Sequence, residues 1–407
     1  MSILQTKPPR SVVVVLAFLQ AFAIATCLAD EVSPIVDDRV KGDIVQHPEI
    51  SQIPEKKAGW KLQAIISAAY DNNIYLSKTN PESDHVYRVG PKISYAKGDV
   101  TEGSGGFVQF AYNPTAVYYA KASSESRIDQ RATWTAGWRG KATVVAYDGS
   151  ILKTADALAD VGRKTDRMET ENRVKIGWTP REKHTYEVSA GHASTNYEDR
   201  GLIDSSSVYG EVAWQYAYSP KTRAGLAYRA SRLKVERSED QIAHQVTGRL
   251  EWQPREKIRV QLEAGAESRR TENGSKVNPV IDGRIEWQPR VGTAFYLTAY
   301  QREVASAYLA GQNYRQLGMT AGVSQRLGKR WTARLEGGRE RAKYTQVSGD
   351  GADRREDRSW FVRPALEYTF TDRLRAEVFY RVSKNQSNFR NLGYDQDLAG
   401  LQLSYEF

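Results

Sequence analysis

The sequence predicts an all-β protein, a transmembrane antiparallel β-barrel of the up-and-down type, and three observations carry this prediction. The chain opens with an export signal, and it closes with an alternating strand that ends on an aromatic residue, Phe407. Between these ends, about eighteen segments of roughly ten residues alternate apolar and polar side chains, as membrane-barrel strands do. One face of such a strand meets lipid and the other lines the interior.

Residues 1–29 have the parts of a secretory signal peptide. Lys7 and Arg10 form a positive region, residues 12–25 are almost entirely apolar, and small residues precede the expected cleavage site. The segment is too short and wrongly flanked for a membrane helix. An alternative is a lipoprotein signal acylated at Cys27, the single cysteine, although the threonine before it is unusual. Ordinary cleavage leaves no cysteine, which excludes disulfides and cysteine metal sites from the mature chain.

Residues 30–58 contain three prolines and little periodicity, and they predict a periplasmic extension. A flexible tail is the preferred interpretation, with a plug or a docking segment as the alternative. Residues 59–407 form the predicted barrel. Loss of the signal removes two basic residues and no acidic one, so the formal net charge of +9 becomes +7. Because the charges alternate along the strands, we expect them in a water-filled interior, where a positive excess favours anions.

The strand pattern is clear in residues 257–269 and 374–383, where aliphatic side chains alternate with charged ones. A helical period of 3.6 would scatter these residues around all sides. The first strand carries aromatic residues at both ends of its apolar face, Trp60 and Tyr70, as the girdles at two membrane interfaces require. A mean hydropathy of −0.60 suggests a soluble protein, but a barrel needs apolar side chains only at every second strand position.

Short turns repeat the pattern Trp-x-Pro-Arg at residues 178–183 and 252–257, and in shortened form at 287–290. Proline suits a turn because it presets φ and ends ladder pairing. These turns alternate with longer connections, as periplasmic turns and outer loops do, and both termini then lie on the periplasmic side. Eighteen strands result, with sixteen as the competing count. They are predicted at 59–72, 84–97, 105–120, 127–139, 141–152, 168–179, 183–196, 205–219, 222–236, 241–253, 257–271, 275–288, 293–305, 313–327, 330–345, 357–370, 373–386 and 393–407.

Two outer connections differ from simple polar loops. Residues 154–166 are more apolar than an exposed loop needs. A surface loop with a short helical turn is the preferred interpretation, and a loop that folds inward and narrows the pore is the alternative. Residues 348–357 are rich in aspartate, but their spacing fits no EF-hand, so a solvated loop is predicted.

The sequence offers little support for an enzyme. The five histidines are scattered, and no nucleophile elbow, P-loop or HExxH motif is present. We therefore predict no enzyme, no cofactor and no metal, with His192 as the one histidine to check for a barrel-enzyme site. Basic residues alternate with acidic ones and form no cluster, which argues against a nucleic-acid partner.

The signal, the proline-bearing lead and the Trp-x-Pro-Arg turns together resemble the outer-membrane barrel porins that accompany exopolysaccharide synthesis and export, over residues 55–407. The resemblance implies a conduit for a secreted, often acidic, polysaccharide. We expect a monomeric barrel in the outer membrane of a Gram-negative bacterium. The implied partners are outer-membrane lipid, the barrel assembly machinery acting on the last strand, the polysaccharide chain and periplasmic parts of an export system. The alternatives are a general or solute-specific diffusion porin for small anionic nutrients and, third, a barrel enzyme or adhesin.

The candidate transport path consists of charged and aromatic side chains on the predicted inner face. The arginines would pair transiently with carboxylates in transit, and the tyrosines would contact sugar faces, since several weak sites suit conduction. The predicted lining residues are Arg249, Arg259, Glu263, Arg284, Tyr296, Tyr300, Arg334, Arg363, Arg375 and Arg381.

Overall fold

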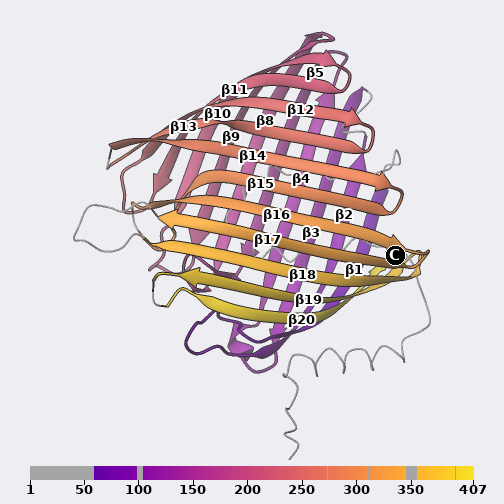
Figure 1. Ribbon diagram of the computed structural model, residues 1–407, viewed down its shortest axis with the longest axis vertical. Coiled ribbons are helices and arrows are strands. Elements are labelled where there is room, and N and C mark those ends of the chain that lie inside the picture. The colour runs from indigo at the N-terminus through magenta and orange to yellow at the C-terminus, as the bar shows by residue number, and fades with distance from the viewer. Residues whose placement is uncertain (1–58, 99–103, 273, 310, 345–354, 390) are drawn as a thin grey trace, which may run out of the picture.

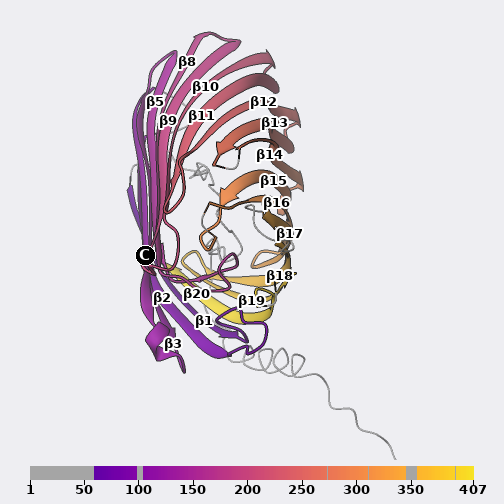
Figure 2. The ribbon, with the colours of Figure 1, turned by 90° about the vertical axis from the view of Figure 1, so that its left-hand side faces the viewer.

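The computed structural model describes residues 59–407, apart from 99–103, 273, 310, 345–354 and 390. Within them, eighteen antiparallel strands form one sheet, and the first strand pairs with both the second and the last, so the sheet closes into a barrel (Figures 1 and 2). The predicted fold class and the count of eighteen are confirmed, and the count of sixteen is wrong. The predicted signal peptide and periplasmic extension lie outside the described residues.

Each strand lies beside its predecessor in the chain, so the barrel is of the up-and-down type. The predicted boundaries differ from the observed ones by two residues at most. The barrel strands are β1 (Gly59–Asp71), β2 (Asp84–Lys97), β3 (Gly105–Tyr119), β4 (Arg127–Arg139), β5 (Thr143–Thr154), β8 (Arg167–Arg181), β9 (His184–Tyr197), β10 (Ser205–Ser219), β11 (Thr222–Val235), β12 (Gln241–Arg255), β13 (Ile258–Thr271), β14 (Gly274–Arg290), β15 (Thr293–Ala305), β16 (Asn313–Leu327), β17 (Trp331–Tyr344), β18 (Glu356–Thr371), β19 (Leu374–Ser387) and β20 (Tyr394–Glu406).

Two small elements lie in the connections. A short 3₁₀ helix, η3 (Ser123–Glu125), joins β3 to β4. The strands β6 (Ala157–Leu158) and β7 (Arg163–Lys164) pair with each other between β5 and β8 and are separate from the barrel sheet. No helix among the described residues is long and apolar enough to span a membrane.

The two faces of the sheet carry different residue types. Directly opposite residues in neighbouring strands share a face, so the ladder partners show which residues lie together. Leu250 lies opposite Leu262, whereas the adjacent Arg249 lies opposite Glu263. The apolar face is exposed: Leu262 and Val246 have exposed fractions of 40% and 56%. Such a surface suits contact with acyl chains, and the alternation agrees with the sequence pattern.

The Trp-x-Pro-Arg segments form turns at one end of the barrel. β8, β12 and β14 end on the arginine of the motif, and the ladder register shifts between its Trp and its Arg. A bulge of this kind accepts proline, because the ladder needs no donor there. The residue before each proline donates its backbone N–H to a neighbouring turn, as Gln253 does to the carbonyl oxygen of Lys221 at 2.7 Å. The tryptophans of the motif stay exposed at the membrane boundary: Trp178, Trp252 and Trp287.

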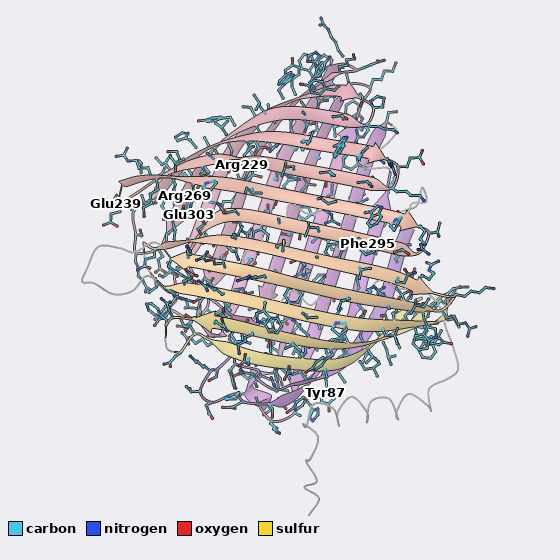
Figure 3. The ribbon with its side chains drawn as sticks, in the orientation of Figure 1. Tyr87, Arg229, Glu239, Arg269, Phe295 and Glu303 are labelled. Carbon is cyan, nitrogen blue, oxygen red and sulfur yellow. The ribbon has the colours of Figure 1, made fainter. Side chains whose placement is uncertain are left out.

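The opposite end of the barrel carries the longer connections, and the rule for bacterial barrels assigns it to the cell exterior. Figure 3 shows Glu239, Arg269 and Glu303 at this end and Phe295 toward the end with the short turns. The buried apolar clusters also gather at the outer end. One cluster contains Leu158, Val161, Leu202 and Ala307, and another contains Tyr314, Ala342 and Tyr344.

On the charged face, aromatic rings lie over glycines of the neighbouring strand. Tyr300 is the direct ladder partner of Gly318, and a Cβ atom on that glycine would overlap the ring. The glycine leaves the space that the ring needs, and the ring covers the exposed backbone. The same arrangement occurs in the pairs Phe107/Gly137, Tyr209/Gly191, Tyr296/Gly322, Phe361/Gly338 and Phe379/Gly400.

Candidate transport path

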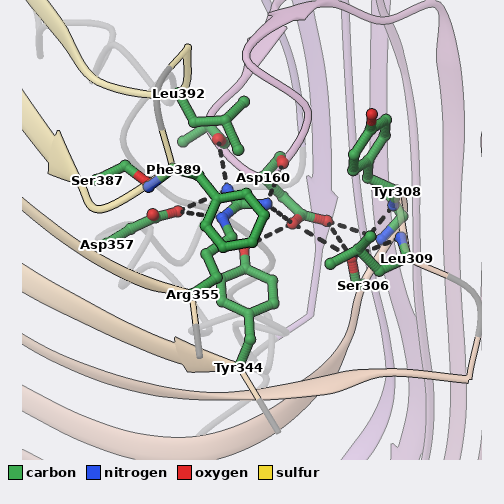
Figure 4. A network of polar contacts seen from close by, with 12 residues as sticks. Asp160, Ser306, Tyr308, Leu309, Tyr344, Arg355, Asp357, Ser387, Phe389 and Leu392 are labelled. Atoms are coloured by element: carbon green, nitrogen blue, oxygen red, sulfur yellow. Dashed lines mark hydrogen bonds and ion pairs between the residues drawn. The ribbon is translucent and has the colours of Figure 1, made fainter. Parts of the chain in front are cut away.

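The connection between β5 and β8, residues 155–166, crosses the outer mouth of the barrel, and we call it the crossing loop. β17 is eight strands from β5 in one direction and nine strands from β8 in the other, so it belongs to the opposite wall. Asp160 of the crossing loop nevertheless contacts Tyr344 at the end of β17 and Arg355 just before β18 (Figure 4). A segment that joins opposite walls spans the lumen between them.

Asp160 is the centre of this anchor. Its carboxylate accepts hydrogen bonds from the Tyr344 hydroxyl at 2.6 Å, the Ala307 backbone N–H at 2.8 Å and the Ser306 hydroxyl at 3.1 Å. Arg355 donates to Oδ1 of Asp160 at 3.2 Å and to its carbonyl oxygen at 2.8 Å. The two charged side chains are 4% and 1% exposed. A charge this buried is stable only when it is paired and hydrogen-bonded, as both are here.

Arg355 also holds the far wall together. Its guanidinium donates to Asp357 at 2.6 Å and lies 4.1 Å from the centre of the Tyr344 ring. Burial by itself lowers the pKa of this guanidinium, but the hydrogen bond to Asp357 and the charges of Asp357 and Asp160 outweigh it and raise the pKa. Arg355 therefore stays charged.

Other connections hold the crossing loop in place. Leu158 and Val161 pack against Leu202 from the β9–β10 connection and against Ala307. The ammonium of Lys164 lies 3.6 Å from the centre of the Tyr119 ring and 3.3 Å from a carboxylate oxygen of Glu125, near η3. The interpretation of residues 154–166 as a surface loop is therefore wrong. Their apolar side chains find buried partners in segments that are distant in the sequence.

The contact with the crossing loop identifies the charged face as the inner one. Tyr344 reaches Asp160 inside the mouth, and the alternate residues of β17 on the same face include Glu340, Glu336 and Arg334. Across the ladder, these residues share their face with the predicted path residues of β15 to β19. The structure thus places the predicted path residues on the wall of the lumen.

Most of the predicted arginines are paired with carboxylates of the same wall. Arg249 donates to Glu211 at 2.7 Å and to Glu263 at 2.9 Å. Arg334 lies 3.0 Å from both Glu367 and Glu377. The remaining pairs join Arg363 to Glu377 at 2.5 Å, Arg284 to Glu286 at 2.7 Å and Arg259 to Glu286 at 3.8 Å. A cation that is neutralised within its own wall contributes little to a long-range field.

The side chains of the other predicted residues lie against neighbouring side chains of the wall. Arg381 is 4% exposed, and its guanidinium is 4.6 Å from the centre of the Phe361 ring. Arg375 borders a cavity of about 480 Å³ at the periplasmic end of the barrel. Tyr296 and Tyr300 donate their hydroxyls to Glu336 and Glu340, and their rings cover glycines. These contacts fix the tyrosines against the wall, which does not favour the predicted role in contacting sugar faces.

Three cations on the inner face of the first two strands were not among the predicted path residues. Lys61 lies opposite Ser94, Arg88 opposite Ser67, and Lys92 opposite Gln63. Within the described part of the chain, no ion pair or hydrogen bond engages the side chains of these three residues. A signal was present, because Arg88 and Lys92 are four residues apart in a predicted strand and therefore share a face.

The structure does not place His192 in the lumen. It is exposed on the outer face of β9, where its ladder partner is the exposed, apolar Val208. Among residues 59–407, with the gaps given above, no group of three or more His, Cys, Asp or Glu side chains is arranged to hold a metal ion.

No known family profile matches the chain, and no curated protein matches it. Among solved structures, the chain is similar to Pseudomonas aeruginosa OpdQ, with a TM-score of 0.46 and 12% identity over 86% of this chain and 98% of that one. Pseudomonas aeruginosa OpdK, crystallised with vanillate, gives the same four values. Acinetobacter baumannii OccAB3 gives a TM-score of 0.45 and 11% identity over 86% and 99%. Nothing in these comparisons links the chain to exopolysaccharide export.

The closed sheet, the apolar outer face and the charged inner face together define the setting of the molecule. A closed barrel satisfies every backbone donor and acceptor within its own ladder, so it can span a bilayer with strands. Barrels with an apolar outer band, aromatic boundary residues and a polar interior are those of bacterial outer membranes. The chain is an eighteen-stranded barrel of a Gram-negative outer membrane.

Proposed function

We propose that this protein is a selective diffusion porin for small anionic solutes. The observation that supports this most strongly is the crossing loop, which spans the outer mouth and is anchored to the opposite wall through Asp160 and Arg355. A polymer in transit needs a passage that stays wide along its whole length. A small solute can instead pass beside a fixed loop. The narrowed mouth therefore favours the small-solute function over polysaccharide export.

The proposed preference for anions rests on Lys61, Arg88 and Lys92. Arg88 lies in the extracellular half of β2, and Lys92 lies further along the same strand toward the periplasm. Lys61 lies near the periplasmic end of β1. At about 3.4 Å per residue, Arg88 and Lys92 are roughly 14 Å apart along the strand. An anion can pass from one such cation to the next, because each is a weak site that releases its ligand. The paired arginines on the other strands serve as structural supports of the wall.

Reversal potentials in planar bilayers test this proposal. The wild-type barrel should prefer anions, and changing Lys61, Arg88 and Lys92 together to Gln should lower the ratio of anion to cation permeability. The loss should be larger at 0.1 M salt than at 1 M, because the screening length falls from about 10 Å to about 3 Å. The matched control replaces both Lys175 and Glu187 by Gln. These two side chains pair at 2.5 Å, so the control removes a pair without changing the net charge. An unchanged permeability ratio in the triple variant would overturn the proposed anion path.

A cellular experiment separates the two transport functions. Deletion of the gene should slow uptake of a small carboxylate or phosphate-bearing nutrient and leave surface polysaccharide unchanged. Loss of surface polysaccharide with normal uptake would support the export function instead. Complementation with a variant that lacks residues 157–164 should restore uptake with a wider size limit, because the lumen would lose its obstruction.

A further inference from the structure

A group of cations lies on the outer, lipid-facing surface near the extracellular ends of β16, β17 and β18. Lys343 is the ladder partner of Arg315, and Arg341 is the ladder partner of Arg358, so these side chains are neighbours across the strands. In β17 they alternate with the inner-face residues Tyr344 and Ala342. We call the group the outer cationic patch, and it consists of Arg315, Arg339, Arg341, Lys343 and Arg358.

The position along β17 puts the patch at the level of lipid headgroups. Trp331, at the periplasmic boundary, and Arg339 share the outer face and are eight residues apart. With a rise of about 3.4 Å per residue and a strand tilt of about 40°, this separation is roughly 21 Å along the membrane normal. The apolar band of a bacterial barrel is about 25 Å tall, so Arg339 lies near its outer edge. Trp360, the ladder partner of Arg339, is an exposed aromatic residue suited to the outer boundary.

Nearby carboxylates neutralise only part of the patch. Glu356 accepts hydrogen bonds from Arg341 at 2.9 Å and from Arg358 at 2.6 Å. Arg315 donates a hydrogen bond to the amide oxygen of Asn278 at 2.6 Å, which leaves its charge in place. Its ladder partner Glu303 accepts hydrogen bonds from the side-chain amides of Asn278 and Asn313.

Arg339 is the residue of the patch that points most clearly to an anionic ligand outside the protein. Its side chain is exposed on the lipid-facing surface, and within the described residues it makes no hydrogen bond and no ion pair. A guanidinium group at the edge of the hydrocarbon region is costly unless an anion meets it there. Met319 is the ladder partner of Arg339, and Leu335 lies four residues before Arg339 on the same face of β17. Both are exposed apolar residues that acyl chains would cover.

We propose that the outer cationic patch binds the phosphate groups of an outer-leaflet glycolipid. Guanidinium groups match phosphate oxygens in a planar, bidentate geometry, and cations at this depth attract anionic headgroups. The patch covers three adjacent strands, which are about 4.8 Å apart, and so it is wide enough for a headgroup with more than one phosphate. The acyl chains of such a lipid would lie against the apolar surface below the patch.

The test uses the full chain refolded in phosphatidylcholine vesicles with or without a bisphosphorylated glucosamine lipid, and lipid retention is measured by native mass spectrometry. The variant changes Arg315, Arg339 and Lys343 together to Gln. Lys343 lies 3.9 Å from a carboxylate oxygen of Glu356, but Arg341 and Arg358, which donate hydrogen bonds to Glu356, stay in place. At about fivefold per cation, retention should weaken roughly a hundredfold. The control is the inner-face variant with Lys61, Arg88 and Lys92 changed to Gln, which loses the same charge and should retain the lipid as the wild type does.

Three outcomes would overturn the proposal. One is equal retention by the patch variant and the control variant. Another is equal binding of the same lipid after its phosphates are removed. A third is a dimeric wild type that becomes monomeric in the patch variant with no change in lipid retention, which would show that the patch contacts a second copy. Heat-modifiable gel migration in phosphatidylcholine alone confirms that each variant is folded. None of these outcomes bears on the proposed anion path, which the inner-face variant tests separately.

Discussion

Asp160→Ala should release the crossing loop and change the current through the pore. The substitution removes the acceptor that Tyr344, Ser306, Ala307 and Arg355 share. Removing one partner of a buried ion pair costs about 3–5 kcal/mol, because the other charge stays buried. Since about 1.4 kcal/mol corresponds to a factor of ten, the ratio of anchored to released loop should fall roughly a hundredfold to a few thousandfold.

Single-channel recording in planar bilayers measures this change. The wild type should show a steady current, and the variant should show a larger mean conductance with added noise as the loop moves in and out of the lumen. The matched control is Asp199→Ala, which removes an exposed carboxylate that pairs with Arg163 of the same loop at 2.5 Å. An exposed pair contributes about 0–1 kcal/mol, so the control should conduct as the wild type does. Identical conductance and noise in wild type and Asp160→Ala would refute the anchor, provided that both are folded.

Three further predictions concern orientation, the two faces and the ring–glycine pairs. A cysteine that replaces Lys257 should resist an impermeant label on intact cells, and a cysteine that replaces Asp353, which lies outside the described residues, should react. The reverse pattern would show that the assigned orientation in the membrane is inverted. Val378→Arg should prevent folding in lipid, since a cation at mid-bilayer costs about 2–4 kcal/mol, whereas Lys92→Gln should fold normally; equal tolerance would mean that the faces are wrongly assigned. Gly318→Ala should lower the heat-modification midpoint, because overpacking costs about 1–3 kcal/mol, and an unchanged midpoint would show that the ring can move aside freely.

The strands could be predicted because their information is local. A period of two, a boundary aromatic and a proline turn all lie within one segment of about ten residues. The spans predicted at 84–97, 127–139 and 205–219 agree with β2, β4 and β10 at both ends. The inner or outer face of a residue follows from the same period, so the predicted path residues lie on the inner wall.

The anchor and the pairing of the wall arginines depend on information that no local pattern holds. Asp160 is 184 residues from Tyr344 and 195 residues from Arg355, and only closure of the barrel brings them together. Arg334 pairs with Glu377, which is two strands away, so its partner depends on the register of two ladders. A count of charges along single strands overestimates the free positive charge of the lumen for this reason.

The rings that lie over glycines have a consequence for how the barrel assembles. A ladder that slips by one residue turns every side chain to the wrong face, so the smallest slip that keeps the faces is two residues. Such a slip would set Tyr300 against Gln316 or Thr320 in place of Gly318. It would set Phe361 against Glu336 or Glu340 in place of Gly338. The side chains of these residues would fill the space that the ring occupies over the glycine. The six pairs occur at five separate strand junctions around the wall. Each ring fits over its glycine only in the observed register. A strand that pairs in a shifted register therefore meets a steric clash at each of these positions before the barrel closes.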